Sequence, residues 1–216
     1  MSERPPLQNR VDPWGRLRRE RTRGSLMGNR GILHVGQEIV RPWATKAWVT
    51  CVLDEKFQKR KPFSPGTYSE LFFLDEATAF AAGHRPCRVC QRQRHDHFNT
   101  AWTAANASVA AGTRLPIADI DKALHGERTE PGKGKRTYTV ALADLPLGAF
   151  FEHAGQARLV WSTGLLVWSF TGYTPGAPLA ADAQVEVLTP RSIVQSFRGG
   201  FRPCVHKTAN APDLCH

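Results

Sequence analysis

Two cysteines separated by two residues are the pair best placed for chemistry. The segment AAGHRPCRVC, residues 81–90, puts Cys87 and Cys90 directly after a helix-stopping glycine. A C-x2-C turn folds into a tight knuckle that directs both thiolates at one tetrahedral metal, usually zinc. A redox pair would instead begin a helix in a thioredoxin-like unit, and two unrelated thiols are the remaining alternative. We therefore predict that Cys87 and Cys90 are zinc ligands.

A second candidate lies in the segment ADIDKALHGER, residues 118–128, where acidic and imidazole side chains recur at helical spacing. Asp121 and His125 are four residues apart on one helix face, so the carboxylate can orient the imidazole for general acid–base chemistry. Glu127 is a further acid–base or metal-binding group. The structural alternative is that Asp119 or Asp121 caps the helix and the dipole favours His125 near its end. We predict Asp121, His125 and Glu127 as catalytic residues.

A zinc deaminase is an alternative interpretation of the same residues. Its signature is H-x-E followed by P-C-x-x-C, and this chain contains both His125-Gly126-Glu127 and a proline before Cys87. The two halves occur in the reverse order here. A deaminase would therefore need a circularly permuted fold.

The third candidate is an arginine-rich amino-terminal segment on a basic chain. The 216 residues carry a formal net charge of +10, and eight arginines lie within residues 1–30. Arginine suits bidentate phosphate contacts, so we expect nucleic acid as the partner, DNA first, with RNA not excluded. The predicted contact residues are Arg16, Arg18, Arg19, Arg21, Arg23, Asn29 and Arg30. The alternative is a solvated basic tail without a specific role.

The pattern of apolar residues and turns predicts an α+β fold that positions these groups. In the amino-terminal half we expect a hairpin over residues 31–53, turning at 42–43, and three helices over 75–82, about 92–112 and 118–128. Asp75 should cap the first helix, and Gly83 should end it. We expect this half to be stabilised by the zinc ion.

The loop EPGKGK, residues 130–135, separates this half from a β-rich remainder. Short strands between glycine and proline turns predict a small β-barrel or a twisted antiparallel sheet, with Trp161 and Trp168 in its core, and a short helix afterwards. The expected divisions are a basic arm, a zinc-binding domain, a small β-rich domain and a tail, over residues 1–30, 31–130, 136–203 and 204–216.

The segment LFFLDEATAFAAGHRPCRVC resembles the zinc-binding domain of the Ada family, the bacterial methyl-phosphotriester repair proteins, in which a short alanine-rich helix precedes a Gly-x-Arg-Pro-Cys-x-x-Cys turn. The likeness runs from AWVTC to Cys90 and is specific over its last ten residues. It implies a zinc site in a DNA-contacting domain, with Cys51 in place of the family's first thiol beside Cys87 and Cys90. Where the family has another cysteine, this chain has Glu55, so methyl transfer is not carried over.

A fourth ligand can be placed by hairpin geometry. If the hairpin turns at residues 42–43, His34 lies opposite Cys51, and both side chains can reach one metal. We therefore predict His34 as the fourth zinc ligand. The alternatives for His34 are a hydrogen-bonded strand histidine or a catalytic base. The competing ligands are Glu55, His95 and His97.

Composition restricts the class of protein. Five cysteines in a chain of this length do not resemble a disulfide framework, and no apolar run is long enough to span a membrane. We expect a bacterial, cytoplasmic, zinc-containing protein that recognises and processes damaged or modified DNA by acid–base chemistry. The alternatives are a non-catalytic nucleic-acid-binding or regulatory module and a zinc hydrolase such as a nuclease or the permuted deaminase.

Overall fold

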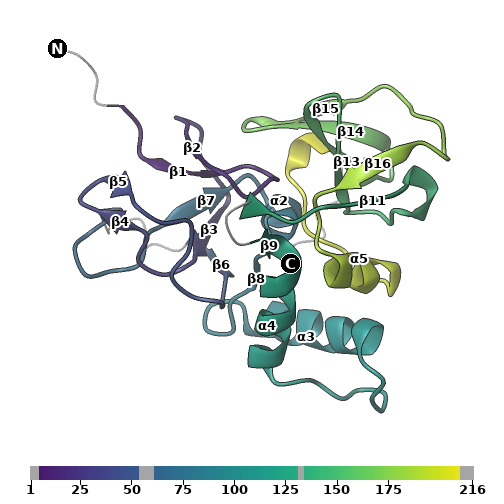
Figure 1. Cartoon of the computed structure of the whole chain (residues 1–216), viewed down its shortest axis with the longest axis horizontal. Coiled ribbons are helices and arrows are strands. Elements are labelled where there is room, and N and C mark those ends of the chain that lie inside the picture. Colours follow the sequence, from purple (N-terminus) through teal and green to yellow (C-terminus); the bar gives the residue numbers. More distant parts are fainter. Residues whose placement is uncertain (1–4, 54–60, 131–133, 210–216) are drawn as a thin grey trace.

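The computed structural model describes residues 5–53, 61–130 and 134–209, and within them the chain has an α+β fold (Figure 1). Its main parts are two six-stranded sheets, here called the N-terminal sheet and the C-terminal sheet, and four α-helices. In Figure 1 the N-terminal sheet lies on the left, the C-terminal sheet at the upper right, and α3, α4 and α5 below them. The expected fold class is confirmed.

The N-terminal sheet has the strand order β2-β1-β7-β3-β6-β8. The pairs β1–β7 and β6–β8 are parallel, and the other neighbours are antiparallel. Its strands are β1 (Gln8–Val11), β2 (Leu17–Arg19), β3 (Leu26–Asn29), β6 (Val49–Val52), β7 (Leu71–Phe73) and β8 (Arg85–Pro86). Residues 8–29, which the sequence analysis assigned to a basic arm, therefore form three strands. The reason is that Val11 and Met27 bury their side chains in the core.

The expected hairpin register is wrong. β4 (His34–Val35) pairs with β5 (Glu38–Ile39) in a tight hairpin of its own, and this pairing places His34 opposite Ile39. Gly36 adopts a positive φ of 58°, which makes the two-residue turn possible. Cys51 pairs instead with Met27 of β3. The turn at Gly36 determines the partner of His34, because it closes the hairpin well before residues 42–43.

The helices follow their local signals closely. They are α2 (Glu76–Ala81), α3 (Arg92–Asn106), α4 (Ile117–Arg128) and α5 (Arg191–Arg198). The Asp75 carboxylate caps α2 by accepting from the Thr78 amide at 2.8 Å, and Gly83 follows with a φ of 83°. α3 ends at Asn106, before the glycine expected to stop it. Within the part of the chain that the structure describes, no helix has the length and apolar character to cross a membrane.

The C-terminal sheet is antiparallel throughout, with the order β11-β16-β12-β13-β14-β15. It is an open sheet and not a closed barrel, since β11 and β15 are its two edges. Its strands are β11 (Tyr138–Ala141), β12 (Phe150–His153), β13 (Gln156–Trp161), β14 (Gly164–Ser169), β15 (Gly172–Pro175) and β16 (Gln184–Val187). A short pair, β9 (Thr129–Glu130) and β10 (Gly134–Lys135), leads into it, and the turns η1 (Leu142–Asp144) and η2 (Lys207–Ala209) complete the elements.

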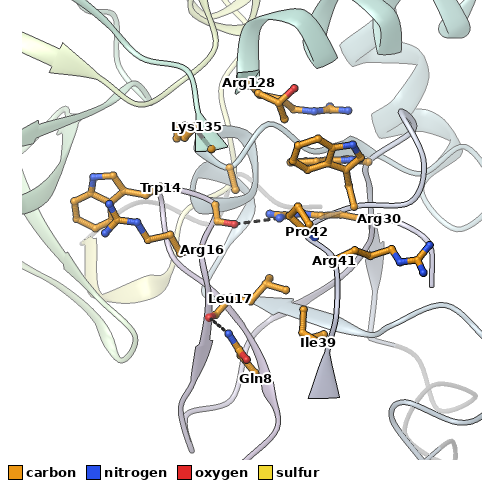
Figure 2. A pocket seen from close by; sticks show the side chains of 16 residues that line it. Gln8, Trp14, Arg16, Leu17, Arg30, Ile39, Arg41, Pro42, Arg128 and Lys135 are labelled. Carbon is orange, nitrogen blue, oxygen red and sulfur yellow. Dashed lines mark hydrogen bonds between the residues drawn. The ribbon is translucent and has the colours of Figure 1, made fainter. Parts of the chain in front are cut away.

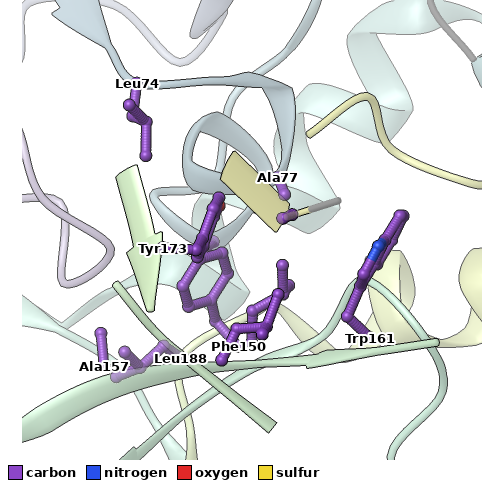
Figure 3. Packing of buried hydrophobic residues seen from close by; sticks show 11 residues of the cluster. Leu74, Ala77, Phe150, Ala157, Trp161, Tyr173 and Leu188 are labelled. Carbon is purple, nitrogen blue, oxygen red and sulfur yellow. The ribbon is translucent and has the colours of Figure 1, made fainter. Parts of the chain in front are cut away.

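Two hydrophobic clusters join the halves that the sequence analysis separated. Leu74 and Ala77, at the start of α2, pack with Phe150 and Tyr173 of the C-terminal sheet (Figure 3). A second cluster joins the faces of α3, α4 and α5, and α5 follows the last strand of the C-terminal sheet. Residue 204, expected to begin a loose tail, is also packed, since the Cys204 amide donates to the Glu76 carboxylate at 2.9 Å. The halves therefore share their cores.

Candidate metal centre

Strand pairing at one edge of the N-terminal sheet brings Cys51 next to the turn that carries Cys87. β6 and β8 run parallel, and their register aligns Thr50 with Pro86. The next residue along each strand is a cysteine, and the Cys87 amide donates to the Thr50 carbonyl at 2.9 Å. One short parallel pair therefore places the two cysteines side by side.

The turn from Cys87 to Cys90 has the hydrogen bonds of a metal-binding knuckle. The Val89 amide donates to the Cys87 Sγ atom at 3.4 Å, and an amide directed at sulfur stabilises a thiolate. The Gln91 amide donates to the Cys87 carbonyl at 3.0 Å, while its side-chain amide donates to the Thr50 carbonyl at 2.8 Å. Gln91 therefore fixes the turn to β6 immediately before α3 begins.

Three sulfur atoms form one cluster. The Sγ atoms of Cys51, Cys87 and Cys90 all lie within 4.8 Å of one another. Zinc–sulfur bonds of about 2.3 Å at tetrahedral angles separate two sulfurs by about 3.8 Å, so the cluster has the size that one zinc ion requires. The structure thus brings together the three predicted cysteines as ligands that could hold a metal ion.

The three thiols of the cluster differ in pKa. The Cys51 thiol donates a hydrogen bond to Cys87, which lowers the pKa of Cys87 to about 5 and raises the pKa of Cys51. Burial raises the pKa of Cys90. These shifts favour Cys87 over the other two cysteines as the thiolate when no metal is bound. A metal requires all three as thiolates, so its binding releases protons.

His34 does not join this cluster, so its prediction as the fourth ligand is corrected. Its Nδ1 atom is hydrogen-bonded to the Ser69 hydroxyl at 2.6 Å, and its ring stacks on Phe63 with centroids 4.7 Å apart. Among the competing ligands, His95 lies 3.1 Å from the Asp96 carboxylate, and Glu55 lies outside the described residues. The described part of the chain therefore contributes three cysteines to the cluster and no further His, Cys, Asp or Glu ligand.

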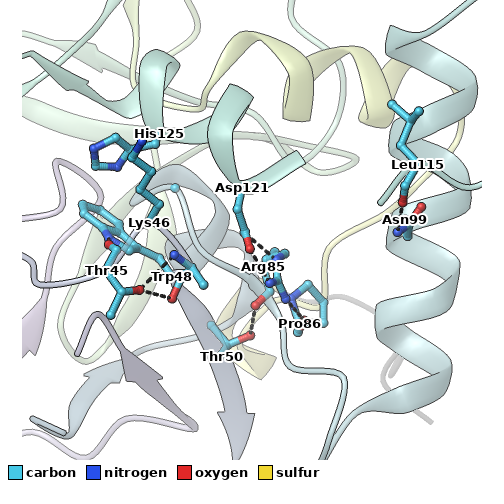
Figure 4. Close-up of polar contacts among 12 residues, drawn as sticks. Thr45, Lys46, Trp48, Thr50, Arg85, Pro86, Asn99, Leu115, Asp121 and His125 are labelled. Atoms are coloured by element: carbon cyan, nitrogen blue, oxygen red, sulfur yellow. Dashed lines mark hydrogen bonds and ion pairs between the residues drawn. The ribbon is translucent and has the colours of Figure 1, made fainter. Parts of the chain in front are cut away.

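The predicted catalytic residues contact three separate partners, and Figure 4 shows one of these contacts, between Asp121 and Arg85. Asp121 forms a buried bidentate ion pair with Arg85, with both N–O distances 2.7 Å. The Glu127 carboxylate accepts from the amide and the hydroxyl of Ser192, at 3.0 and 2.7 Å. The half-buried His125 ring packs edge-on against Trp43 at 5.6 Å, and burial lowers its pKa. α4 places the three groups as the helical pattern predicts, but tertiary packing gives each a structural contact.

Most of the predicted nucleic-acid contacts lie on the surface. Five arginines on and around β2 are exposed, and together they are called here the arginine edge: Arg16, Arg18, Arg19, Arg21 and Arg23. The two other predicted contact residues are less exposed. Asn29 is half-buried and accepts from the Gly31 amide at 2.7 Å, which stabilises a turn. Arg30 is only 2% exposed, because its guanidinium packs 4.0 Å from the Trp48 ring centroid.

Sequence reasoning assigned no role to Arg85, Arg128 or Lys135. Arg128 is 2% exposed and its guanidinium also lies 4.0 Å from the Trp48 ring centroid. The only local signal was Gly83, whose positive φ was expected for a helix end. A Cβ atom at Gly83 would lie 2.5 Å from Cδ of Arg128, so this glycine also makes room for the buried arginine.

No family model, curated protein or solved structure matches this chain. The resemblance of residues 71–90 to the Ada-family zinc domain remains a prediction.

Proposed function

We propose that this protein binds DNA through the arginine edge and that a zinc ion on the cysteine cluster stabilises the same sheet. The observation that carries the proposal is the concentration of five exposed guanidiniums within residues 16–23 of a chain with net charge +10. Such a group neutralises phosphates and releases counterions, which drives association with DNA. Arg19 is partly engaged by Glu38 at 2.8 Å, an exposed pair that phosphate can replace at small cost.

The zinc ion has a structural role in this proposal. It would join β6 to the turn after β8 at the edge of the sheet opposite to β2. These two elements meet through a short parallel pair, and α3 starts directly after the turn. A metal bridge would therefore fix three elements that few backbone hydrogen bonds hold together.

The proposal is restricted to binding and omits the processing of damaged DNA. The residues expected to act as acid and base are engaged in an ion pair, a helix cap and an aromatic contact. None of these contacts orients the His125 imidazole through a carboxylate, which was the basis for expecting chemistry.

The zinc assignment is tested by metal content. The purified protein should contain about one zinc per chain, measured by mass spectrometry of the metal, and Cys87→Ser or Cys51→Ser should lose it together with thermal stability. Val89→Ala is the matched control, because Val89 lies within the same turn but is 92% exposed. Full zinc occupancy in the cysteine variants would exclude the cluster as the site.

DNA binding is tested by its dependence on salt, measured by fluorescence anisotropy on a duplex. The double substitution Arg18→Ala/Arg23→Ala should reduce the slope of log K against log salt by about 1 to 2, since fewer phosphates are contacted. Arg92→Ala/Lys122→Ala removes the same charge from exposed positions on α3 and α4. Equal slopes in the two double variants would contradict a specific arginine edge.

A further inference from the structure

A cavity of about 390 Å³ lies beside the arginine edge, between the N-terminal sheet, α4 and β10. Figure 2 shows Arg128 and Lys135 at one end of it, Leu17 and Ile39 at the other, and Arg30 between them. Arg16 of the arginine edge also lines the cavity. The cavity therefore continues from the exposed guanidiniums into the interior of the protein.

The inner end of the cavity has more buried positive charge than negative charge. The positive charges here, on Arg30, Arg128 and Lys135, repel one another. Burial lowers the pKa of Lys135 to about 7. Two carboxylates attract these cations: Asp12 attracts Arg30 and Lys135, and Asp121 attracts Arg128 but is already paired with Arg85. Buried cations are costly unless they are paired, so an anion at this end would stabilise the protein.

Hydrogen-bond donors without partners occur at the same end. Arg30 donates from Nε to the His84 ring at 3.2 Å and from Nη1 to the Gly15 carbonyl at 3.0 Å, but its Nη2 atom has no partner among the described residues. Arg128 donates to the Gly83 and Lys46 carbonyls, each at 2.6 Å, and its Nε atom is likewise unpartnered. A buried donor without an acceptor costs free energy, and a small shift of either guanidinium toward the cavity would let an oxyanion recover it.

The rest of the lining is apolar and aromatic. Leu17, Ile39 and Pro42 contribute aliphatic surface, and Trp14 and Trp43 contribute indole rings. Both indoles are half-buried, so part of each ring remains accessible. Aromatic side chains of this kind stack on nucleobases. A ligand that fits the whole cavity therefore combines an anionic group with a flat ring.

We propose that this cavity is a nucleotide site in which Arg30, Arg128 and Lys135 bind the phosphate and the aromatic wall contacts the base. Its volume lies within the usual range for small-molecule sites, roughly 300–1,000 Å³. If the nucleotide is the phosphorylated end of a DNA strand, this site rests on the proposed DNA binding. If the nucleotide is a free mononucleotide, the site is independent of DNA binding. The two sources share the same chemistry.

Calorimetry on the full-length protein with deoxyadenosine 5′-monophosphate tests the proposal. Saturable one-to-one binding is expected, at least tenfold tighter than that of inorganic phosphate or deoxyadenosine. Lys135→Met and Arg30→Met should each weaken it tenfold or more. Arg136→Met is the matched control: it removes the same charge from the neighbouring exposed residue, which does not line the cavity, and it should leave the affinity within twofold. If Arg30→Met fails to fold, Arg41→Ala replaces it, since Arg41 is exposed and lines the cavity.

Competition distinguishes the two sources. The bound mononucleotide is challenged with a single-stranded oligonucleotide, with and without a 5′-phosphate. Displacement only by the 5′-phosphorylated oligonucleotide would identify a strand end as the ligand. If neither oligonucleotide displaces the mononucleotide, the ligand is a free nucleotide. No saturable binding, equal affinities for the mononucleotide and inorganic phosphate, or unchanged affinity in the cavity variants would overturn the proposal. A covalently closed duplex without ends reports separately on the arginine edge, so a failure of either proposal is recognised independently of the other.

Discussion

Asp121 and Arg85 form an ion pair whose side chains are 8% and 6% exposed. The pair connects α4 to β8, the strand that leads directly into the cysteine turn. The Asp121 carboxylate therefore has a structural contact next to the cysteine turn. At the scale of single residues, this buried ion pair thus holds α4 against the strand that leads into the cysteine turn.

The first residue-scale prediction concerns this pair. Asp121→Asn should lower the free energy of unfolding by about 3 kcal/mol, because it leaves the buried Arg85 guanidinium without a counterion. Urea denaturation measures the change. His125→Ala, one turn along α4 and half-buried, should cost much less. If Asp121→Asn leaves the free energy of unfolding unchanged, the ion pair with Arg85 does not stabilise the protein.

His84 provides a second prediction, because it is fully buried and accepts from Arg30 while Arg128 and Lys135 lie nearby. Burial and these cations lower its pKa well below the ordinary value of 6.5. The unfolded chain then binds a proton that the folded protein does not. The free energy of unfolding should therefore decrease as the pH falls below about 6.5, by about 1.4 kcal/mol per pH unit.

The measurement is urea denaturation between pH 8 and pH 5, compared with His84→Gln. Glutamine can accept the Arg30 hydrogen bond but does not titrate, so this variant should have a flatter pH dependence. The other nearby groups, Asp12 and His125, remain in both proteins and cancel in the comparison. Identical pH profiles would show that His84 is not the titrating group.

At the scale of elements, the amino terminus of α5 is capped by a side chain from another helix. α5 begins after Pro190, which offers no side-chain cap. The Glu127 carboxylate of α4 instead accepts from the Ser192 amide and hydroxyl. An anion at a helix amino terminus is also favoured by the helix dipole. Glu127 thus joins α4 to α5 at the point where the two halves of the chain meet.

We expect Glu127→Ala to lower the free energy of unfolding by about 0.5 to 2 kcal/mol, the usual effect of losing a helix cap. Glu127→Gln should cost less, since its amide oxygen still accepts from Ser192. The proposed zinc and DNA binding should be unchanged in both variants, because Glu127 and Ser192 belong neither to the cysteine cluster nor to the arginine edge. A loss of DNA binding at unchanged stability in Glu127→Gln would instead restore the catalytic or binding interpretation.

At the scale of the whole molecule, the amino-terminal strands belong to the fold. β1 lies between β2 and β7, and Val11 is completely buried. Deleting residues 1–23 would therefore remove two strands and expose the core beneath β7. Circular dichroism and thermal melting should show an unfolded or strongly destabilised protein, whereas Arg18→Ala/Arg23→Ala should melt near the wild type. A deletion variant that melts normally would show that these strands are dispensable.

Several elements could be predicted from the sequence because their signals are local. The Asp75 cap, the positive φ of Gly83 and the periodicity of α4 depend on residues within a few positions of one another. The two-residue spacing of Cys87 and Cys90 likewise determines their turn. The alternation of short strands also predicted the antiparallel C-terminal sheet, although not whether it would close.

Only the tertiary structure decided which distant residues meet. Cys51 pairs with Met27 and not with His34, because the Gly36 turn closes another hairpin first. Arg30, predicted at the surface, is buried against Trp48 together with Arg128, which is remote in the chain. Strand register and burial result from competition among all segments for one core. Local spacing therefore determined the cysteine turn and the helices, whereas packing decided that Cys51 joins Cys87 and Cys90 and that the cations gather at one cavity.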